Sequence, residues 1–275
     1  TNGSGVFKST NGGASWSAVN TGLTDHAVVQ ALAIDPSAST TLYAGTVGRV
    51  AKSTNSATSW EVINTGLTNA FVQVLATDPS APMTLYAGTE GGGVFQSTSG
   101  GVSWSAVNTG MTSTLVQALV VDPSVPTTLY AGTQSGGVFK SIDGGVNWSA
   151  MNTGLTNMRV EALAVDFSAP TTLYAGTNGG VFKSIDSGAN WIAMNTGLTS
   201  LSVRALVIDP STPTTLYVGT PLRVFKSTDG GASWSVLRTG LNPRFAVKSL
   251  ALTASTVYAG TSGSGVFKRD PRYGD

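Results

Sequence analysis

The stretch SIDGGVNW, from Ser141 to Trp148, decides the fold because close copies of it recur at a fixed interval. Counted along the chain, the copies put tryptophan at 44-, 44-, 44-, 43- and 43-residue steps, and every tryptophan of the protein lies on that series. The tyrosines of the LYAGT segments keep the same period. A period of this length with no residue left over indicates one supersecondary unit copied along the chain. The tryptophans are Trp16, Trp60, Trp104, Trp148, Trp191 and Trp234.

Each copy carries four short segments that are typical of strands. In one copy these are VEALAVD (160–166), TTLYAGT (171–177), GGVFKSI (179–185) and ANWIAMN (189–195). Turns rich in Gly, Pro, Asp and Ser separate them, and the 3.6-residue apolar spacing of a helix is absent. Four strands per copy, called A to D in chain order, predict the blade of a β-propeller.

Counting strands predicts how the propeller closes. The chain begins with a C and a D strand, continues with five complete blades, and ends with A, B and a second C strand. We therefore expect one all-β domain over 1–275, a six-bladed β-propeller of four-stranded antiparallel blades. Its closing blade is expected to pair the N- and C-terminal strands, from 1–20 and 245–268. Seven blades, or an excerpt of a longer repeat array, are the alternatives.

One C strand is redundant in this scheme. TNGSGVFK (1–8) and TSGSGVFK (261–268) differ at one position. The spare copy is displaced, belongs to a longer array, or pairs with another molecule. The last reading predicts self-association through terminal strands.

The repeated stretch resembles the Asp-box (BNR) motif, Ser-x-Asp-x-Gly-x-(Ser/Thr)-Trp, of sialidases, sortilin-type receptors, xyloglucan hydrolases and photosystem assembly factors. STDGGASW (227–234) matches it fully, whereas Asn11 and Ser99 replace the aspartate and STNSATSW (53–60) lacks both Asp and Gly. The resemblance covers nearly the whole chain and implies a propeller, but it implies no particular activity. It also implies that the tryptophans belong to the hydrophobic layer of each blade. We expect the Asp-box aspartates to be structural acceptors of backbone N–H bonds; they are Asp143, Asp186 and Asp229.

The two rims of the predicted propeller differ in how strictly the copies repeat. The A–B turns and the Asp boxes share one rim, here the Asp-box rim, and are nearly invariant. The B–C turns and the segments from strand D to strand A share the other, here the variable rim. The B–C turns read TVGRV, TEGGGV, TQSGGV, TNGGV and TPLRV. Turns that differ on one rim only indicate that this rim is the working face.

Basic side chains gather on the variable rim and favour an anionic or hydroxyl-rich ligand, because Arg and amide groups match carboxylates and hydroxyls. One residue per copy, at the start of strand A, is expected to ring the mouth of a central channel; ordered water is the alternative occupant. That series is Gln30, Gln73, Gln117, Glu161, Arg204 and Lys248. The remaining candidate ligand-binding residues are Arg49, Glu90, Arg159, Arg223 and Arg244. The lysines of the VFK segments, at 8, 140, 183, 226 and 268, are expected to solvate blade edges.

The sequence lacks the residues that the enzymatic alternatives would need. Six of the seven tyrosines are fixed in the repeat, so none is offered to the rim as a sialidase nucleophile. The rim acids lie on different blades, and no pair stands out for glycoside hydrolysis. The single histidine, His26, and the lack of cysteine exclude His/Cys metal clusters. We expect no enzyme and no cofactor, with glycoside hydrolysis kept as the remaining alternative.

Composition limits the partners. The 275 residues carry a net charge of +1, and only 11% of them are charged. The protein therefore has no strong positive electrostatic field that would attract nucleic acid. No apolar run is long enough to insert in a membrane. We expect an extracellular or periplasmic module that binds a glycan or a protein partner, or else a structural protein assembling head to tail.

Overall fold

The computed structural model describes residues 1–275 except 24–26, 70, 238–245, 254–255 and 270–275. Its described residues form strands and turns and contain no helix, so none forms a helix that could span a membrane. The chain has two compact units, Thr1–Thr133 with Phe139–Ala150, and Gln134–Val138 with Met151–Asp275. The fold is the predicted one, an all-β, six-bladed β-propeller of antiparallel four-stranded blades.

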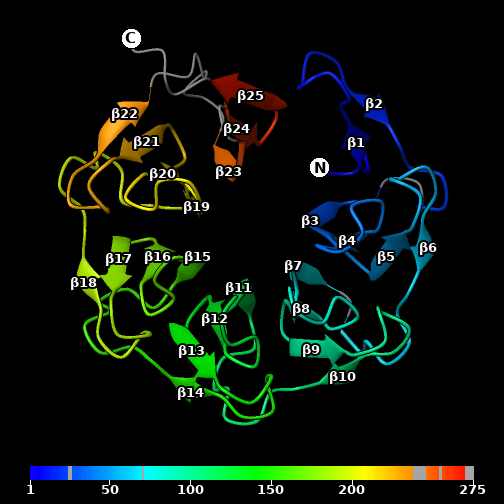
Figure 1. Ribbon diagram of the computed structural model, residues 1–275, viewed down its shortest axis with the longest axis horizontal. Coiled ribbons are helices and arrows are strands. Elements are labelled where there is room, and N and C mark those ends of the chain that lie inside the picture. Colours follow the sequence, from blue (N-terminus) through cyan, green and yellow to red (C-terminus); the bar gives the residue numbers. More distant parts are fainter. Residues whose placement is uncertain (24–26, 70, 238–245, 254–255, 270–275) are drawn as a thin grey trace. The chain divides into compact units, whose positions relative to one another are not determined.

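Five blades are complete four-stranded sheets in which the strands pair in chain order (Figure 1). The first three are β3 (Val29–Ile34), β4 (Leu42–Thr46), β5 (Arg49–Ser53) and β6 (Glu61–Val62); β7 (Val72–Thr77), β8 (Leu85–Thr89), β9 (Gly93–Ser97) and β10 (Ser105–Ala106); and β11 (Val116–Val121), β12 (Leu129–Thr133), β13 (Val138–Ser141) and β14 (Ser149–Ala150). The fourth and fifth are β15 (Val160–Val165), β16 (Leu173–Thr177), β17 (Gly180–Ser184) and β18 (Ile192–Ala193); and β19 (Ala205–Ile208), β20 (Leu216–Gly219), β21 (Val224–Ser227) and β22 (Ser235–Leu237).

The strands of the sixth blade are divided between two smaller sheets. One contains β1 (Phe7–Lys8) and β2 (Ser17–Ala18), and the other contains β23 (Val247–Thr253), β24 (Thr256–Thr261) and β25 (Val266–Arg269). The N-terminal strands belong to the first unit and the C-terminal strands to the second, so the expected closing pairing within 1–20 and 245–268 stays a prediction. Strand β24 pairs with β25, the second C-strand copy. The two copies are nearly identical, and a short hairpin closes at a lower entropic cost than a contact across the whole chain.

The hydrophobic core consists of layers between consecutive blades. In the first unit, β3 contacts β7 and β7 contacts β11; in the second, β15 contacts β19 and β19 contacts β23. Three of these layers combine a tyrosine of one blade with the phenylalanine and tryptophan of the next. Tyr43, for example, packs with Phe95 and Trp104, and Tyr174 packs with Phe225 and Trp234. The LYAGT period is thus the period of the core.

Each Asp-box tryptophan joins its blade to the blade before it. The Trp104 indole N–H donates to the Ile63 carbonyl at 2.8 Å, and its backbone N–H donates to the Thr65 carbonyl at 2.8 Å. Trp60, Trp148, Trp191 and Trp234 repeat the indole bond, to Val19, Val107, Met151 and Met194, each at 2.8 Å. Trp16 differs: it is 44% exposed, against 3% for Trp104.

The Asp box itself is a closed network of hydrogen bonds. Asp186 accepts hydrogen bonds from the Asn190 backbone at 2.9 Å, the Asn190 side chain at 2.8 Å and the Ser184 hydroxyl at 2.7 Å. Where the aspartate is replaced, the network persists: Asn55 accepts from the Ser59 backbone and the Ser53 hydroxyl. Ser56 and Ala57 keep positive φ (58° and 69°) although neither is glycine. The turn geometry is therefore held by the surrounding bonds.

Lysines of the VFK segments do more than solvate edges, and that expectation is wrong. The Lys183 ammonium lies 5.3 Å from the ring centroid of Tyr174 and donates to the Gly230 carbonyl in the next blade's Asp box. Lys8 donates to the Ser56 carbonyl at 3.0 Å. Lys140 and Lys226 lie over tyrosine rings in the same way. These lysines stabilise contacts within and between blades through cation–π and carbonyl interactions.

Replacing Trp104 by Phe should lower the free energy of unfolding by about 1–3 kcal/mol, because the half-buried Ile63 carbonyl loses its donor. Chemical denaturation monitored by circular dichroism measures this loss. Trp16→Phe is the matched control and should change stability by less than about 0.5 kcal/mol, since that side chain is exposed. Equal losses in both variants would contradict the role assigned to the indole bond.

Acid should destabilise the Asp boxes. Hydrogen bonds from the Asn190 side chain and backbone and from Ser184 lower the pKa of Asp186 to about 2, and those from Ser233 and Ser227 lower the pKa of Asp229 to about 2. Because the folded pKa lies below the unfolded value, this stabilisation is present above about pH 4 and is lost as pH falls towards 2.

The measurement is the melting temperature of the wild type and of Asp186→Asn/Asp229→Asn between pH 5 and pH 2. We expect the wild type to lose more than the variant over this interval, because asparagine makes the same turn contacts without titrating. Parallel curves for the two proteins would rule out this origin of acid sensitivity.

Candidate functional site: the variable rim

The B–C turns of the variable rim are fixed at their base by a buried threonine that ends strand B. The Thr177 hydroxyl donates to the Gly180 carbonyl and accepts from the Gly179 N–H, each at 2.9 Å. Thr89 makes the equivalent bond to Gly93. The turn residues beyond these threonines change from blade to blade, so the rim presents different side chains on one repeated backbone frame.

The residues at the start of strand A are placed by a β-bulge. The pairing of A with B shifts register around one residue, for example between Val160 and Ala162. A bulged residue leaves the ladder and its side chain is redirected. The sequence series coincides with this position in five blades, at Gln30, Gln73, Gln117, Glu161 and Lys248.

In the first unit, two predicted residues bind each other. The Gln73 amide donates to the Glu90 carboxylate at 2.9 Å, which joins the start of strand A to the B–C turn of the same blade. Arg49 is half-buried in the first blade. Beside it the exposed Val47 and Phe71 form a bridge between neighbouring blades. This part of the rim is mixed, with an amide–carboxylate pair and an apolar bridge.

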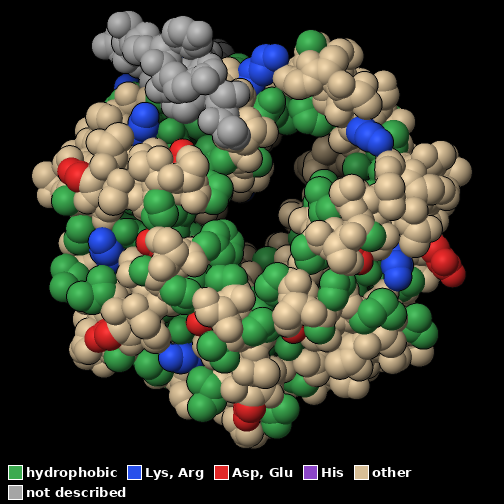
Figure 2. Space-filling model, in the orientation of Figure 1, with side chains coloured by type: hydrophobic (Ala, Val, Ile, Leu, Met, Phe, Trp, Pro, Cys, Tyr) green, Lys and Arg blue, Asp and Glu red, His purple; other side chains and the backbone are tan. Residues whose placement is uncertain are grey.

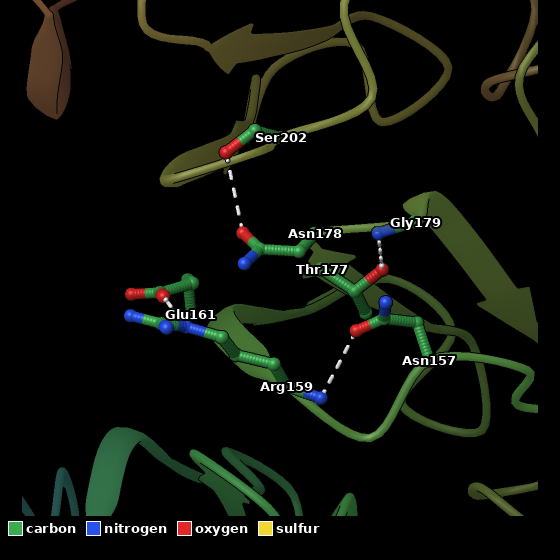
Figure 3. Close-up of polar contacts among 7 residues, drawn as sticks. All are labelled: Asn157, Arg159, Glu161, Thr177, Asn178, Gly179 and Ser202. Atoms are coloured by element: carbon green, nitrogen blue, oxygen red, sulfur yellow. Dashed lines mark hydrogen bonds and ion pairs between the residues drawn. The ribbon is translucent and has the colours of Figure 1, made fainter.

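In the second unit, Arg159 and Glu161 form an ion pair (Figure 3). Both side chains point away from the B–C turn, and the Arg159 backbone N–H is held by the Asn157 side chain at 3.0 Å. Across the turn, the Ser202 hydroxyl of the fifth blade donates to Asn178 of the fourth at 3.2 Å. Arg159 is thus neutralised by Glu161.

The fifth blade carries two arginines without a neutralising partner. Neither Arg204 nor Arg223 forms a side-chain hydrogen bond or an ion pair with the described residues. Arg223 is exposed and Arg204 is half-buried. Leu201 and Leu222 are exposed on the same blade, at 44% and 51%. This blade therefore combines uncompensated positive charge with apolar surface.

The structure places the other candidates separately. Gln30 and Lys248 are exposed and Gln117 is half-buried, each on its own blade. Arg244 lies outside the described residues, as does His26. The role of the whole series as a channel ring stays a prediction.

The apolar side chains of the rim were not among the predicted site residues. These are Val47, Phe71, Met158, Leu201 and Leu222. Their signal in the sequence was large apolar residues in turns and turn-flanking positions, although exposed apolar side chains such as Ile142 and Phe167 also occur on the Asp-box rim. On the face drawn in Figure 2, Lys and Arg side chains of each unit lie singly among hydrophobic and uncharged ones.

The described part of the rim contains paired carboxylates and arginines without an acidic partner among the described residues. Its two carboxylates, Glu90 and Glu161, are each bound by a neighbouring amide or guanidinium. No group of three His, Cys, Asp or Glu residues that could hold a metal ion occurs within the described ranges. Arg204 and Arg223 remain as donors for carboxylate or hydroxyl groups.

Solved structures share this fold at low sequence identity. The chain is similar to the GH74 enzyme of Niastella koreensis (TM-score 0.79, 23% identity, 98% of this chain and 49% of that one). It is also similar to YCF48 bound to D1 peptide (0.74, 14%, 98% and 87%). A third similar structure is the extracellular domain of the one-component system protein BT4673 of B. thetaiotaomicron (0.77, 16%, 97% and 36%).

These likenesses establish the fold alone. The chain spans between about two fifths and half of the GH74 chains that it matches. No family model and no curated protein sequence matches it.

Proposed function

We propose that this propeller is a non-enzymatic binding or assembly module that holds a carboxylate- or hydroxyl-bearing protein or glycan partner on its variable rim. The observation that carries the proposal is the contrast between the two rims. The Asp-box rim is occupied by structural bonds such as Gly100 N–H to Met83 carbonyl and Gly144 N–H to Thr127 carbonyl, both at 2.8 Å. The variable rim holds arginines with no neutralising partner among the described residues.

The similar structures support a module of this kind. Their names include GH74 enzymes, a propeller bound to a peptide and the extracellular domain of a signalling protein. A protein or a glycan partner is therefore compatible with the fold. By the same comparison we propose that the module works outside the cytoplasm.

The buried tyrosines and paired carboxylates favour binding over catalysis. The repeat tyrosines from Tyr43 to Tyr217 are at most 2% exposed, and burial raises the pKa of Tyr217 to about 12. A buried phenol that resists ionisation is a poor nucleophile. Glu161 is engaged in an ion pair with Arg159.

The test uses glycan and peptide arrays probed with the wild type and with Arg49→Gln/Arg204→Gln/Arg223→Gln. We expect the variant to lose about 10-fold or more in array signal with an unchanged melting temperature, because charge-assisted bonds to the ligand are removed. Ile142→Ser, an exposed change on the Asp-box rim, is the control and should bind like the wild type. If the triple variant binds the arrays as strongly as the wild type, the proposal is wrong. Turnover of a fluorogenic glycoside panel that Glu161→Gln abolishes would overturn the non-enzymatic part.

A second candidate function is head-to-tail self-assembly through the spare C strand. It is favoured by one observation: β24 pairs with β25, while β1 pairs with β2 and with no other strand of the described part of the first unit. Strand addition at the free edge of such a sheet is a common way for chains to associate.

Deleting residues 1–8 should then change the oligomeric state measured by light scattering over a range of protein concentrations. The control is Ile192→Ser, an exposed change on the outer strand β18 that leaves β1 intact. A monomer both with and without residues 1–8 would eliminate self-assembly.

A further inference from the structure

The fifth blade departs from a rule that holds the variable rim together elsewhere. In the second blade, Asn108 accepts a hydrogen bond from Val94 N–H at 2.6 Å and donates to the Gly92 carbonyl at 2.8 Å. The residue between them, Gly93, has no room for a side chain: a Cβ there would lie 2.3 Å from the Asn108 amide oxygen. The pairs Gly137/Asn152 and Gly180/Asn195 repeat this arrangement.

Arginine replaces both members of that pair in the fifth blade. Arg223 stands at the glycine position, and the sequence has Arg238 at the asparagine position. Arg238 lies outside the described residues, so only its place in the repeat is used. The first blade has Arg49 at the glycine position but keeps Asn64, which still accepts from Val50 N–H at 2.7 Å. The double replacement is therefore particular to the fifth blade.

The turn that presents Arg223 is nevertheless well ordered. Thr220 N–H donates to the Arg223 carbonyl at 2.9 Å, and the Thr220 hydroxyl makes bonds of 3.0 and 3.1 Å with the Arg223 carbonyl and N–H. Thr220 itself is fully buried. Because the backbone is fixed by a buried group, Leu222 and Arg223 are held outward without the asparagine, and less entropy is lost when they bind a ligand.

Arg204 lies on the other side of the same central strand. Its backbone N–H donates to the Gly219 carbonyl at 2.8 Å, so it borders the end of β20 as Arg223 does from β21. Strands A and C are two strand spacings apart, about 10 Å. Two extended arginine side chains span that separation and are able to grip one ligand segment from both sides.

The surroundings of the two arginines favour a peptide over a sugar. Leu201 and Leu222 are exposed beside them. Sugar rings are commonly held against aromatic faces, but the aromatic residues of the fourth and fifth blades that could serve, Tyr174, Tyr217, Trp191 and Trp234, are at most 5% exposed. Exposed leucine next to uncompensated arginine matches a segment in which acidic and apolar side chains alternate.

We propose that the rim of the fifth blade, formed by Leu201, Arg204, Leu222 and Arg223, is a docking site for an extended acidic peptide that carries leucine-sized side chains beside its carboxylates. This inference rests on the proposed binding function and narrows it to one blade and one ligand class. Arg204 and Arg223 bind the carboxylates, and the two leucines cover the apolar side chains.

The experiment measures fluorescence anisotropy with three labelled hexapeptides: alternating Asp-Leu, alternating Asn-Leu and alternating Asp-Ser. The Asp-Leu peptide should bind at least about 10-fold more tightly than the other two, because each lacks one of the two matched groups. Arg223→Gln and Arg204→Gln should each weaken its binding about 10-fold. Ile142→Ser, an exposed change on the Asp-box rim, is the control and should bind like the wild type.

Two results would overturn the inference. In the first, the wild type does not bind the Asp-Leu peptide, or Arg204→Gln/Arg223→Gln binds it as tightly as the wild type does. In the second, the wild type binds an oligogalacturonate but not the Asp-Leu peptide, and the same double variant loses the oligogalacturonate binding. The array experiment separates this failure from failure of the general proposal. If the triple rim variant loses array signal while Arg204→Gln/Arg223→Gln does not, the rim still binds a partner but the fifth blade is not the site.

Discussion

The hydrogen bond from the Asp-box indoles of five blades to a main-chain carbonyl of the preceding blade is the contact on which the rest of the structure depends. A buried N–H without an acceptor costs about 1–3 kcal/mol, so the large apolar ring is positioned by a directional requirement as well as by packing. From Trp60 to Trp234 this bond has the same length, 2.8 Å. It sets the spacing of consecutive blades, and the tyrosine–phenylalanine layers between them follow from that spacing.

This requirement also explains why one rim is constant. The turn that delivers the tryptophan must return the chain within a few residues, which the Ser–Asp network and positive-φ residues accomplish. A carbonyl of the A–B turn of the same blade accepts a hydrogen bond from a backbone N–H of the Asp box, as Met83 does from Gly100. With most backbone groups committed there, substitutions fall on the opposite rim, where a buried threonine and, in most blades, an asparagine fix the base of the turn.

Electrostatics follow the same division. The low content of charge means that individual pairings decide what the rim offers, rather than a general field. The Glu161 carboxylate neutralises the Arg159 guanidinium, and the Gln73 amide donates a hydrogen bond to the Glu90 carboxylate. Arg204 and Arg223, in contrast, have no acidic partner among the described residues. The lysines of the VFK segments, in contrast, are used inside the fold, over tyrosine rings and at Asp-box carbonyls. Similar formal charges thus have different roles according to the strand that carries them.

The sequence by itself determined the blade, its four strands and the two rims, because the period of Trp and Tyr reports the repeated core contacts directly. It could not decide which of two near-identical C strands pairs with β24, since that choice depends on hairpin geometry and loop entropy. Nor could it separate paired from unpaired arginines: Arg159 and Arg204 both lie near the start of a strand A, and only the side-chain positions in space show that Arg159 meets Glu161. The two-residue period of a strand indicates on which face of the sheet a side chain lies. Which other side chain it contacts depends on bulges, turns and the neighbouring blade, and these are known only from the tertiary structure.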